Sequence, residues 1–295
     1  MSIKIESKSS GRFKFEAISS EGVVRNLGEF DNLITDIGLT RMGANSDYLA
    51  YCRVGSGSTT PQFTDTSLVS QVAGVGGAVS TDGVAPVPPY HAWSQRVFTF
   101  AAGVAAGNLS EVGVGWAASG TTLFSRALIL DASNNPTTIT IQPDETLRVT
   151  YVHKYFPNIV DSTGTVTLTG NLAGTYSYVA RPANVTTSLN WVSSRSQTSS
   201  TTSGSNYFYS GDIGGITSQP SGTPSAVTYS SNISDPLTAE FTLTAGVDAA
   251  NFVGGVKSYL IRAGNGTYQV GFTPAIPKLS DEELQLKFKF SWGRR

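Results

Sequence analysis

Regular alternation of apolar and polar residues is the feature that most constrains the fold of this chain. The clearest case is LQLKFKFSW near the end, where one face carries Leu284, Leu286, Phe288, Phe290 and Trp292. Residues 147–155 alternate in the same way. Successive side chains of a β-strand point to opposite faces, so an alternating segment buries one face and leaves the other to solvent or a partner. Both segments are therefore predicted to be half-buried strands.

Similar segments recur along the chain and predict an all-β protein. Further candidate strands are residues 12–18, 48–54, 96–101, 111–116, 122–130, 137–142, 239–244, 256–262 and 267–272. Many short alternating strands separated by turns are typical of antiparallel β-sandwich domains, here expected to be jelly-roll-like. Residues 56–89 keep no period for long. We expect a long loop there, with a short helix near residues 65–71.

A length of 295 residues favours two domains over one. A boundary is expected just after VHKYFP, which gives an N-terminal β-sandwich domain at 1–157 and a C-terminal one at 158–295. Within the second, the segment SSRSQTSSTTSGS at 193–205 is polar and of low complexity, so it is predicted to be a mobile loop or hairpin tip.

The strands that close the two halves resemble each other. DETLRVTYVHKYF and DEELQLKFKFSW both place an acidic turn before an alternating run, and their leucines Leu147 and Leu284 are 137 residues apart. A duplicated β-unit explains this offset. The alternative is that any two half-buried closing strands look alike.

One stretch, FDNLITDIGL at residues 30–39, reads as the start of a helix. Asp31 or Asn32 is a suitable cap, and Leu33, Ile34 and Ile37 follow at spacings that share a helical face. We expect a short amphipathic helix over residues 33–42 that plugs an open end or edge of a sheet. On this interpretation Ile37→Asp yields an insoluble protein or an unstable monomer.

Charge and composition exclude several classes of partner. Charged residues make up 14% of the chain, against about 25% in an average globular protein, and the net charge is −1 without a basic cluster. Phosphate binding needs clustered Lys and Arg, so no nucleic-acid partner is expected. The first residues lack the apolar core of a signal peptide, and no apolar run reaches the roughly 20 residues of a membrane span. We expect folding in the cytosol and no membrane insertion.

Residues able to carry chemistry are few. His153 lies on the apolar face of a predicted strand, which favours a core histidine over a catalytic one. His91 has no metal-ligating residue at ligand spacing. Cys52, the single cysteine, excludes an intrachain disulfide and is expected to be buried rather than reactive.

Acidic pairs precede both closing strands. The pairs Asp144–Glu145 and Asp281–Glu283 have the composition of a glycosidase acid and base or of calcium ligands, but turn residues at a strand entry are the more common case. The segment VGSGSTTP lacks the Lys-Ser/Thr of a phosphate loop. No catalytic, cofactor-binding or metal site is predicted.

The aromatic triplet Tyr207, Phe208 and Tyr209 follows the polar segment. Exposed aromatic residues at loop tips often anchor a sugar or a protein partner, which makes this triplet a candidate contact. The alternative is that the three residues alternate in an ordinary strand.

An ordered set of segments gives the chain a family resemblance. FDNLITDIGLTRMG, YCRVGSGSTTPQFTDTSL, SEVGVGW and LFSRALILDASNNPTTITIQPDETLRVTYVHKYFP occur in this order within the first 157 residues, and the chain closes with KLSDEELQLKFKFSWGRR. Together they resemble structural proteins of tailed bacteriophages, of the tail fibre, collar fibre or minor tail protein kind. The chain differs from long receptor-binding fibres because it has no extended repeat, collagen-like Gly-X-Y or long coiled coil.

The resemblance implies a non-enzymatic virion component. It implies an oligomer, as a trimer or higher ring, that binds other tail, neck or baseplate proteins and is made in the host cytoplasm. Residues 1–157 would then form the virion-attachment part. A receptor-binding or carbohydrate-binding tail fibre or adhesin module, with a bacterial surface glycan as partner, is the alternative. A glycan-cleaving enzyme is the third hypothesis, for which the sequence offers few acidic residues on strand faces.

Overall fold

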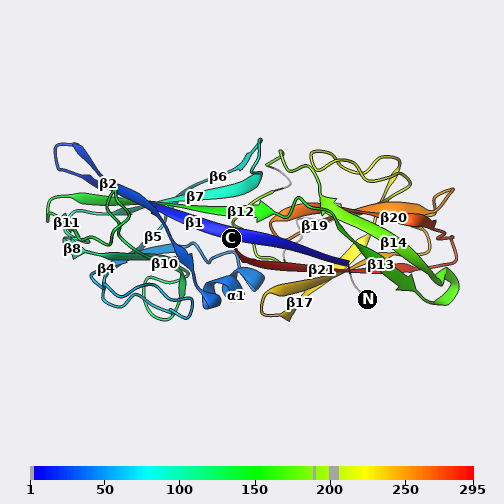
Figure 1. Cartoon of the computed structure of the whole chain (residues 1–295), viewed down its shortest axis with the longest axis horizontal. Coiled ribbons are helices and arrows are strands. Elements are labelled where there is room, and N and C mark those ends of the chain that lie inside the picture. Colours follow the sequence, from blue (N-terminus) through cyan, green and yellow to red (C-terminus); the bar gives the residue numbers. More distant parts are fainter. Residues whose placement is uncertain (1–2, 189–190, 199–205) are drawn as a thin grey trace. The chain divides into compact units, whose positions relative to one another are not determined.

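The computed structural model describes residues 3–188, 191–198 and 206–295 of the chain (Figure 1). β-Strands in antiparallel sheets make up most of these residues, and their one α-helix is α1, Asp36–Ala44, near the N-terminus. The prediction of an all-β fold with one short helix is therefore confirmed. The described residues include no helix with the length and apolar character required to cross a membrane.

The chain divides into two compact units. Unit 1 contains residues 3–8, 83–92 and 155–293, and unit 2 contains residues 9–82, 93–154 and 294–295. The main division, between residues 154 and 155, is close to the predicted boundary. The early segments 3–8 and 83–92, however, group with the C-terminal half. The reason is that five strands contribute residues to both units: β1, Ile3–Ile18; β6, Val79–Ala85; β7, His91–Phe100; β12, Thr146–Pro157; and β21, Leu284–Arg294.

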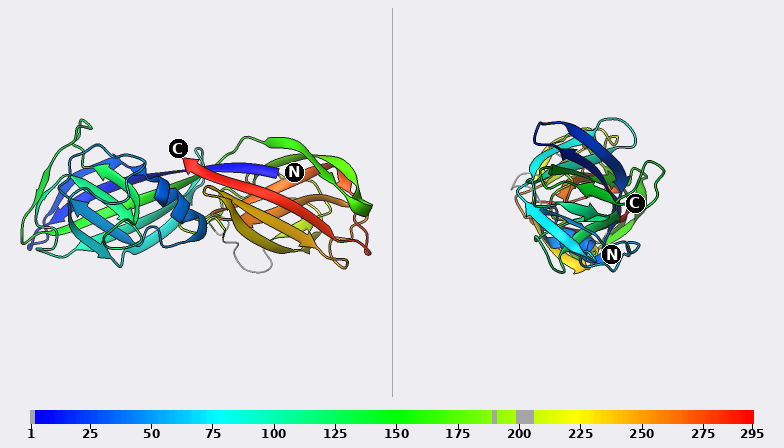
Figure 2. Two further views of the ribbon diagram at one scale, coloured as in Figure 1. Left: turned by 90° about the horizontal axis from the view of Figure 1, so that it is seen from below. Right: turned by 90° about the vertical axis from the view of Figure 1, so that its left-hand side faces the viewer.

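Unit 1 is built from two sets of antiparallel strands. A six-stranded sheet has the order β13-β14-β20-β19-β15-β16, of which β13, β14, β19 and β20 are labelled in Figure 1. Its strands are β13, Ser162–Leu168; β14, Gly174–Pro182; β15, Tyr207–Tyr209; β16, Pro224–Ala226; β19, Val256–Ala263; and β20, Gly266–Ile276. The 3-10 helix η1, Gly170–Leu172, joins β13 to β14. In the second set, β17, Thr228–Asp235, pairs with β18, Thr238–Ala245, which pairs with the red strand β21 (Figure 2).

Unit 2 contains a five-stranded sheet with the order β3-β10-β9-β4-β5 and a two-stranded sheet of β8 and β11. In addition, β2 pairs with β1 as an antiparallel hairpin. The strands not yet given are β2, Val24–Asp31; β3, Leu33–Ile34; β4, Tyr51–Gly55; β5, Gln71–Gly76; β8, Gly107–Leu109; β9, Glu111–Gly115; β10, Leu123–Leu128; and β11, Ile139–Ile141.

The two strongest alternating segments bury the faces that their sequences predict. In β12 the buried residues are Leu147, Val149, Tyr151, His153 and Tyr155. In β21 they are Leu284, Leu286, Phe288, Phe290 and Trp292. The same alternation extends over all of β1, because Ser7 and Ser9 are buried at positions that continue the apolar face. The sequence predicted only residues 12–18 of that strand, since serine breaks the hydropathy pattern without breaking the strand.

The helix begins later than predicted, and a different face is buried. Leu33 and Ile34 belong to β3, which pairs with β10. The N-cap is Thr35, whose hydroxyl accepts a hydrogen bond from the Gly38 N–H at 3.0 Å, instead of Asp31 or Asn32. The prediction of Leu33, Ile34 and Ile37 as one buried helical face is wrong.

The buried helical residues are Gly38, Leu39, Met42 and Gly43, whereas Ile37 is only half-buried. The helix contacts β10, and a Cβ atom added at Gly38 would lie 2.4 Å from the carbonyl oxygen of Phe124. Glycine at this position therefore permits the helix to pack directly against the strand backbone. The helix packs through these other residues against β10, which lies inside the five-stranded sheet and not at its edge.

Residues 56–89 contain strands where the sequence predicted a loop. β5 occupies residues 71–76 and β6 follows at residues 79–85, while no helix forms over residues 65–71. Gly74 and Gly76 in β5 and Asp82 and Gly83 in β6 interrupt the apolar period, so hydropathy alone did not reveal these strands.

The polar segment at 193–205 is described only up to residue 198, and residues 199–205 lie outside the described part of the chain. Ser193 and Gln197 are fully buried, and the Arg195 N–H donates a hydrogen bond to the Asn265 side chain at 2.9 Å. The first part of the predicted mobile loop is thus packed into unit 1. Ser193, Ser196 and Gln197 are buried, whereas the other described residues of the segment are partly exposed.

Candidate interaction surface

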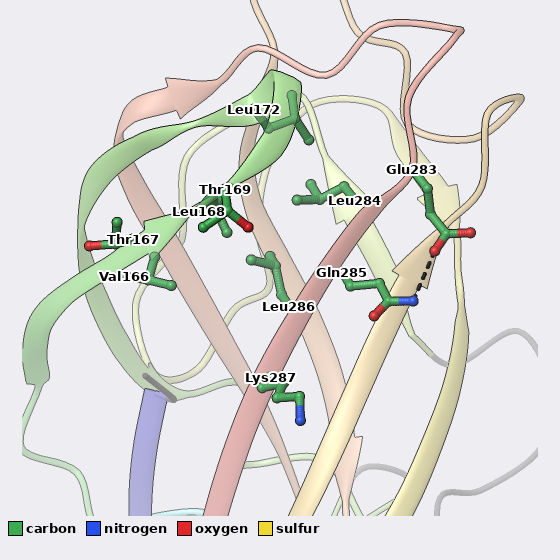
Figure 3. A pocket seen from close by; sticks show the side chains of 10 residues that line it. All are labelled: Val166, Thr167, Leu168, Thr169, Leu172, Glu283, Leu284, Gln285, Leu286 and Lys287. Atoms are coloured by element: carbon green, nitrogen blue, oxygen red, sulfur yellow. Dashed lines mark hydrogen bonds between the residues drawn. The ribbon is translucent and has the colours of Figure 1, made fainter.

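A groove of about 500 Å³ opens in unit 1 between β13 and β21 (Figure 3). Side chains from β13, from the segment around η1 and from the start of β21 surround it. The lining residues are Val166, Thr167, Leu168, Thr169, Leu172, Glu283, Leu284, Gln285, Leu286 and Lys287. The two walls, β13 and β21, belong to different sheets. The groove therefore lies on a side of the unit where no strand is shared by the two sheets.

The lining of the groove combines apolar side chains with two titratable ones. Val166, Leu172, Leu284 and Leu286 form buried apolar parts of its lining. The titratable lining residues are Glu283 and Lys287, and the Glu283 carboxylate accepts a hydrogen bond from Gln285 Nε2 at 2.8 Å. Glu283 is the one carboxylate among the lining side chains.

The predicted aromatic contact is mostly buried. Tyr207, Phe208 and Tyr209 form β15, whose residues alternate between the faces of the six-stranded sheet. Phe208 is fully buried with its ring 6.1 Å from that of Tyr259, and Tyr209 is also buried. Only Tyr207 is partly exposed. The triplet is therefore an ordinary strand. Phe208 points into the core because side chains alternate along a strand, and Tyr209 is buried as well, so neither residue is available as an exposed anchor.

A buried ionic network in unit 2 holds the segment between β4 and β5. Glu111 accepts hydrogen bonds from the N–H groups of Gly57 at 3.1 Å, Val69 at 3.1 Å and Ser70 at 2.7 Å. Arg126 pairs with the same carboxylate at 2.9 Å and with Asp65 at 2.7 Å. Of the three donors, the Gly57 N–H belongs to the segment VGSGSTTP, and Val69 and Ser70 follow it in the chain.

A second buried arginine fixes the turn between β9 and β10. Arg53 lies in β4 and donates hydrogen bonds to the carbonyl oxygens of Ala117 and Gly120 at 2.9 and 2.8 Å. Sequence reasoning did not single out Arg53, Glu111 or Arg126. Each of them stands within an apolar strand segment, and a charged residue at such a position is the signal that would have found them.

The remaining candidates for chemistry occupy structural positions. His153 is fully buried with its ring edge-on to Tyr48 and Phe124, as expected of a core histidine. His91 packs against Phe156, with ring centroids 5.0 Å apart. Cys52 is fully buried, and desolvation raises the pKa of its thiol above the ordinary value. Over residues 3–188, 191–198 and 206–295, no group of three or more His, Cys, Asp or Glu side chains is placed to hold a metal ion.

Both acidic pairs contribute turns. The Glu145 carboxylate accepts a hydrogen bond from the Gln142 N–H at 2.8 Å and pairs with Arg25. Glu282 accepts from the Leu279 N–H at 3.0 Å. These contacts agree with turn residues at strand entries.

Comparisons of the chain with protein-family models, with curated proteins and with solved structures find no match.

Proposed function

We propose that the chain is a non-enzymatic structural subunit of a tailed-phage virion. It would belong to the tail, neck or collar, or anchor a fibre. In this proposal it is made in the host cytoplasm, assembles with copies of itself and binds other tail, neck or baseplate proteins. The sequence resemblance over the first 157 residues is the starting point, and the way the resembling segments are used in the fold supports it.

The observation that carries the proposal is that four separate resembling segments meet in one structural module. YCRVGSGSTTPQFTDTSL supplies Arg53 and Asp65, SEVGVGW supplies Glu111, and LFSRAL supplies Arg126. From FDNLITDIGLTRMG, Thr35 donates a hydrogen bond to the Leu123 carbonyl oxygen at 2.6 Å. Their polar groups are used to hold loops and a helix on a sheet. A protein selected to keep one rigid surface for assembly needs such a module, whereas an enzyme needs polar groups left facing substrate.

Electron microscopy of purified phage particles with an antibody to this chain tests the proposal. Labelling at the neck, tail or tail tip, together with the chain's peptides in the mass spectrum of the particles, is the expected result. Particles that contain no trace of the chain contradict the proposal.

A carbohydrate-binding module is a second candidate, because unit 1 has a hollow of about 140 Å³ with sugar-binding residue types. Tyr178 and Phe272 line it together with Asp212 and Lys257. Aromatic faces next to charged hydrogen-bonding groups are suited to sugars. A glycan array with the native chain, Tyr178→Ala and Tyr207→Ala tests this candidate. Binding that Tyr178→Ala alone removes would favour it, and no binding by the native chain would exclude the arrayed glycans.

A further inference from the structure

β13 is an edge strand of the six-stranded sheet whose free side faces the groove (Figure 3). It pairs with β14 through seven consecutive residues without a register shift. Its first residue, Ser162, donates a hydrogen bond from its hydroxyl to the Lys4 carbonyl oxygen at 2.9 Å. The open side of the strand therefore begins at Thr163. An edge of this kind presents unpaired backbone N–H and C=O groups to any extended chain that approaches.

Other described edge strands carry features that discourage such pairing. β2, β6 and β17 contain charged side chains, and β2 and β17 also have register shifts. β5 has a register shift against β4. β3 has two residues, while β8, β11 and β16 have three each. Charges, bulges and shortness are the usual means by which proteins protect a sheet edge. β13 has seven residues and none of these means.

The open part of β13, together with Thr169 directly after it, is complementary to itself. Residues 163–169 read TGTVTLT, so that Thr163, Thr165, Thr167 and Thr169 lie on one face and Gly164, Val166 and Leu168 on the other. In an antiparallel pair centred on Val166, each threonine meets a threonine, Val166 meets Val166, and Gly164 meets the larger Leu168. The same threonine face already pairs across strands, since Thr167 Oγ1 lies 3.3 Å from Thr175 Oγ1 on β14.

We propose that β13 pairs in antiparallel fashion with β13 of a second copy of this chain, about a two-fold axis at Val166. Self-pairing requires that no like charges meet across the axis, and residues 163–169 contain no charged side chain. A charged partner strand would find no opposite charge along this edge, whereas an identical neutral strand matches its residues. The groove provides room beside residues 166–169, which form one half of the proposed pairing segment. The proposal names the partner in the oligomer and therefore rests on the proposed structural function.

Register-specific disulfide formation tests the pairing in the full chain. Residues directly opposite in such a pair have Cα atoms about 4.5–5.5 Å apart, within disulfide range, whereas diagonal neighbours lie at about 7–8 Å. Thr165 is opposite Thr167 of the second copy. A mixture of Thr165→Cys and Thr167→Cys chains, one carrying a size tag, should therefore give a mixed cross-linked dimer under mild oxidation. Either variant alone should give at least tenfold less. Cys52 is buried and is therefore not expected to form a cross-link.

Charge placed at the edge gives an independent readout. Thr165→Lys with Thr167→Lys sets lysines opposite lysines, so the dimer measured by sedimentation should dissociate at concentrations where the native chain is paired. The matched control is Thr175→Lys with Ser177→Lys on β14, two exposed residues of the same face that lie one strand further in. The control should leave the dimer intact.

Equal cross-linking by the mixture and by the single variants overturns the proposal, as does a native chain that is monomeric at high concentration. Loss of particle incorporation on the β13 lysine substitutions, without any self-association of the native chain, would mean that another virion protein occupies the edge, which also overturns it. These outcomes are separate from antibody labelling of particles. Failure of the pairing therefore leaves the virion assignment standing, and failure of the labelling leaves the pairing measurable.

Discussion

Glu111 and Arg126 form an ion pair of 2.9 Å with side chains that are 0% and 1% exposed. Glu111 comes from β9 and Arg126 from the neighbouring strand β10. Burying two charges is costly unless every polar group around them is satisfied, and here the carboxylate also accepts three backbone N–H groups. The pair is the point at which the loop after β4 is attached to the sheet.

Glu111→Gln should destabilise the chain by about 3–5 kcal/mol, because the substitution leaves the Arg126 charge buried with only part of its compensation. Urea unfolding followed by tryptophan fluorescence measures this loss. Arg12→Gln is the control, since its ion pair with Glu29 is about half exposed and is expected to contribute only about 0–1 kcal/mol. Equal effects of the two substitutions would contradict the role given to the buried pair.

Gly38→Ala should cost about 1–3 kcal/mol, although alanine is the better helix former, because the added Cβ atom would overlap the Phe124 carbonyl oxygen. Thr40→Ala on the exposed side of the same helix is the control and should change stability by less than about 1 kcal/mol. Ile37→Asp, expected from sequence to be insoluble or unstable as a monomer, should now give soluble protein because Ile37 is only half-buried. Thermal unfolding of the three variants measures these changes in stability. A Gly38→Ala variant more stable than the native chain would disprove the close packing.

The sequence predicted the strands whose pattern follows from burial alone. β12 and β21 alternate because each has one face in a core, and hydropathy records that directly. The predicted offset of 137 residues also has a structural counterpart. The Glu145 N–H donates to the Gln142 carbonyl oxygen at 3.0 Å while the side chain caps the Gln142 N–H, and Glu282 repeats both contacts with Leu279. The same turn thus precedes both closing strands.

Other features depend on contacts between residues distant in sequence. Leu33 and Ile34 fit a helix by spacing, but pairing with β10 places them in a strand. Gln197 reads as part of a polar loop, yet its side chain accepts a hydrogen bond from the buried Tyr155 hydroxyl at 3.3 Å. The groove combines β13 and β21, whose lining residues are over 110 positions apart. No local sequence pattern predicts that these two strands lie next to each other, because the packing of the sheets depends on the whole chain.

Glu16 should make stability fall at acidic pH. A hydrogen bond from Lys14, followed by the hydrogen bond and charge of Arg148, lowers the pKa of this carboxyl below its ordinary value. Because the folded-state pKa is the lower one, the stabilisation is complete above the unfolded-state pKa and is lost as the pH falls through the folded-state pKa. Both partners are partly exposed, so screening limits the effect to about 1 kcal/mol.

The measurement is the unfolding free energy of the native chain and of Glu16→Gln at neutral pH and near pH 3. The variant should be less stable at neutral pH, and the two should converge in acid. Glu21→Gln, at an exposed residue, is the control and should follow the native chain at both pH values. A difference between native and Glu16→Gln that persists unchanged in acid would mean that the carboxylate charge is not its source.

Cys52 should resist alkylation for as long as unit 2 stays folded. The thiol is fully buried and desolvation raises its pKa, so both access and the reactive thiolate are lacking. With iodoacetamide at pH 8, modification followed by mass spectrometry should be slower than in urea by about a thousandfold or more, because native proteins open globally in only about 10⁻³ of molecules or fewer. Glu111→Gln should speed the reaction in proportion to its lost stability, whereas Arg12→Gln should not. Rapid modification of the native chain would show that β4 is accessible and would refute the buried position of this residue.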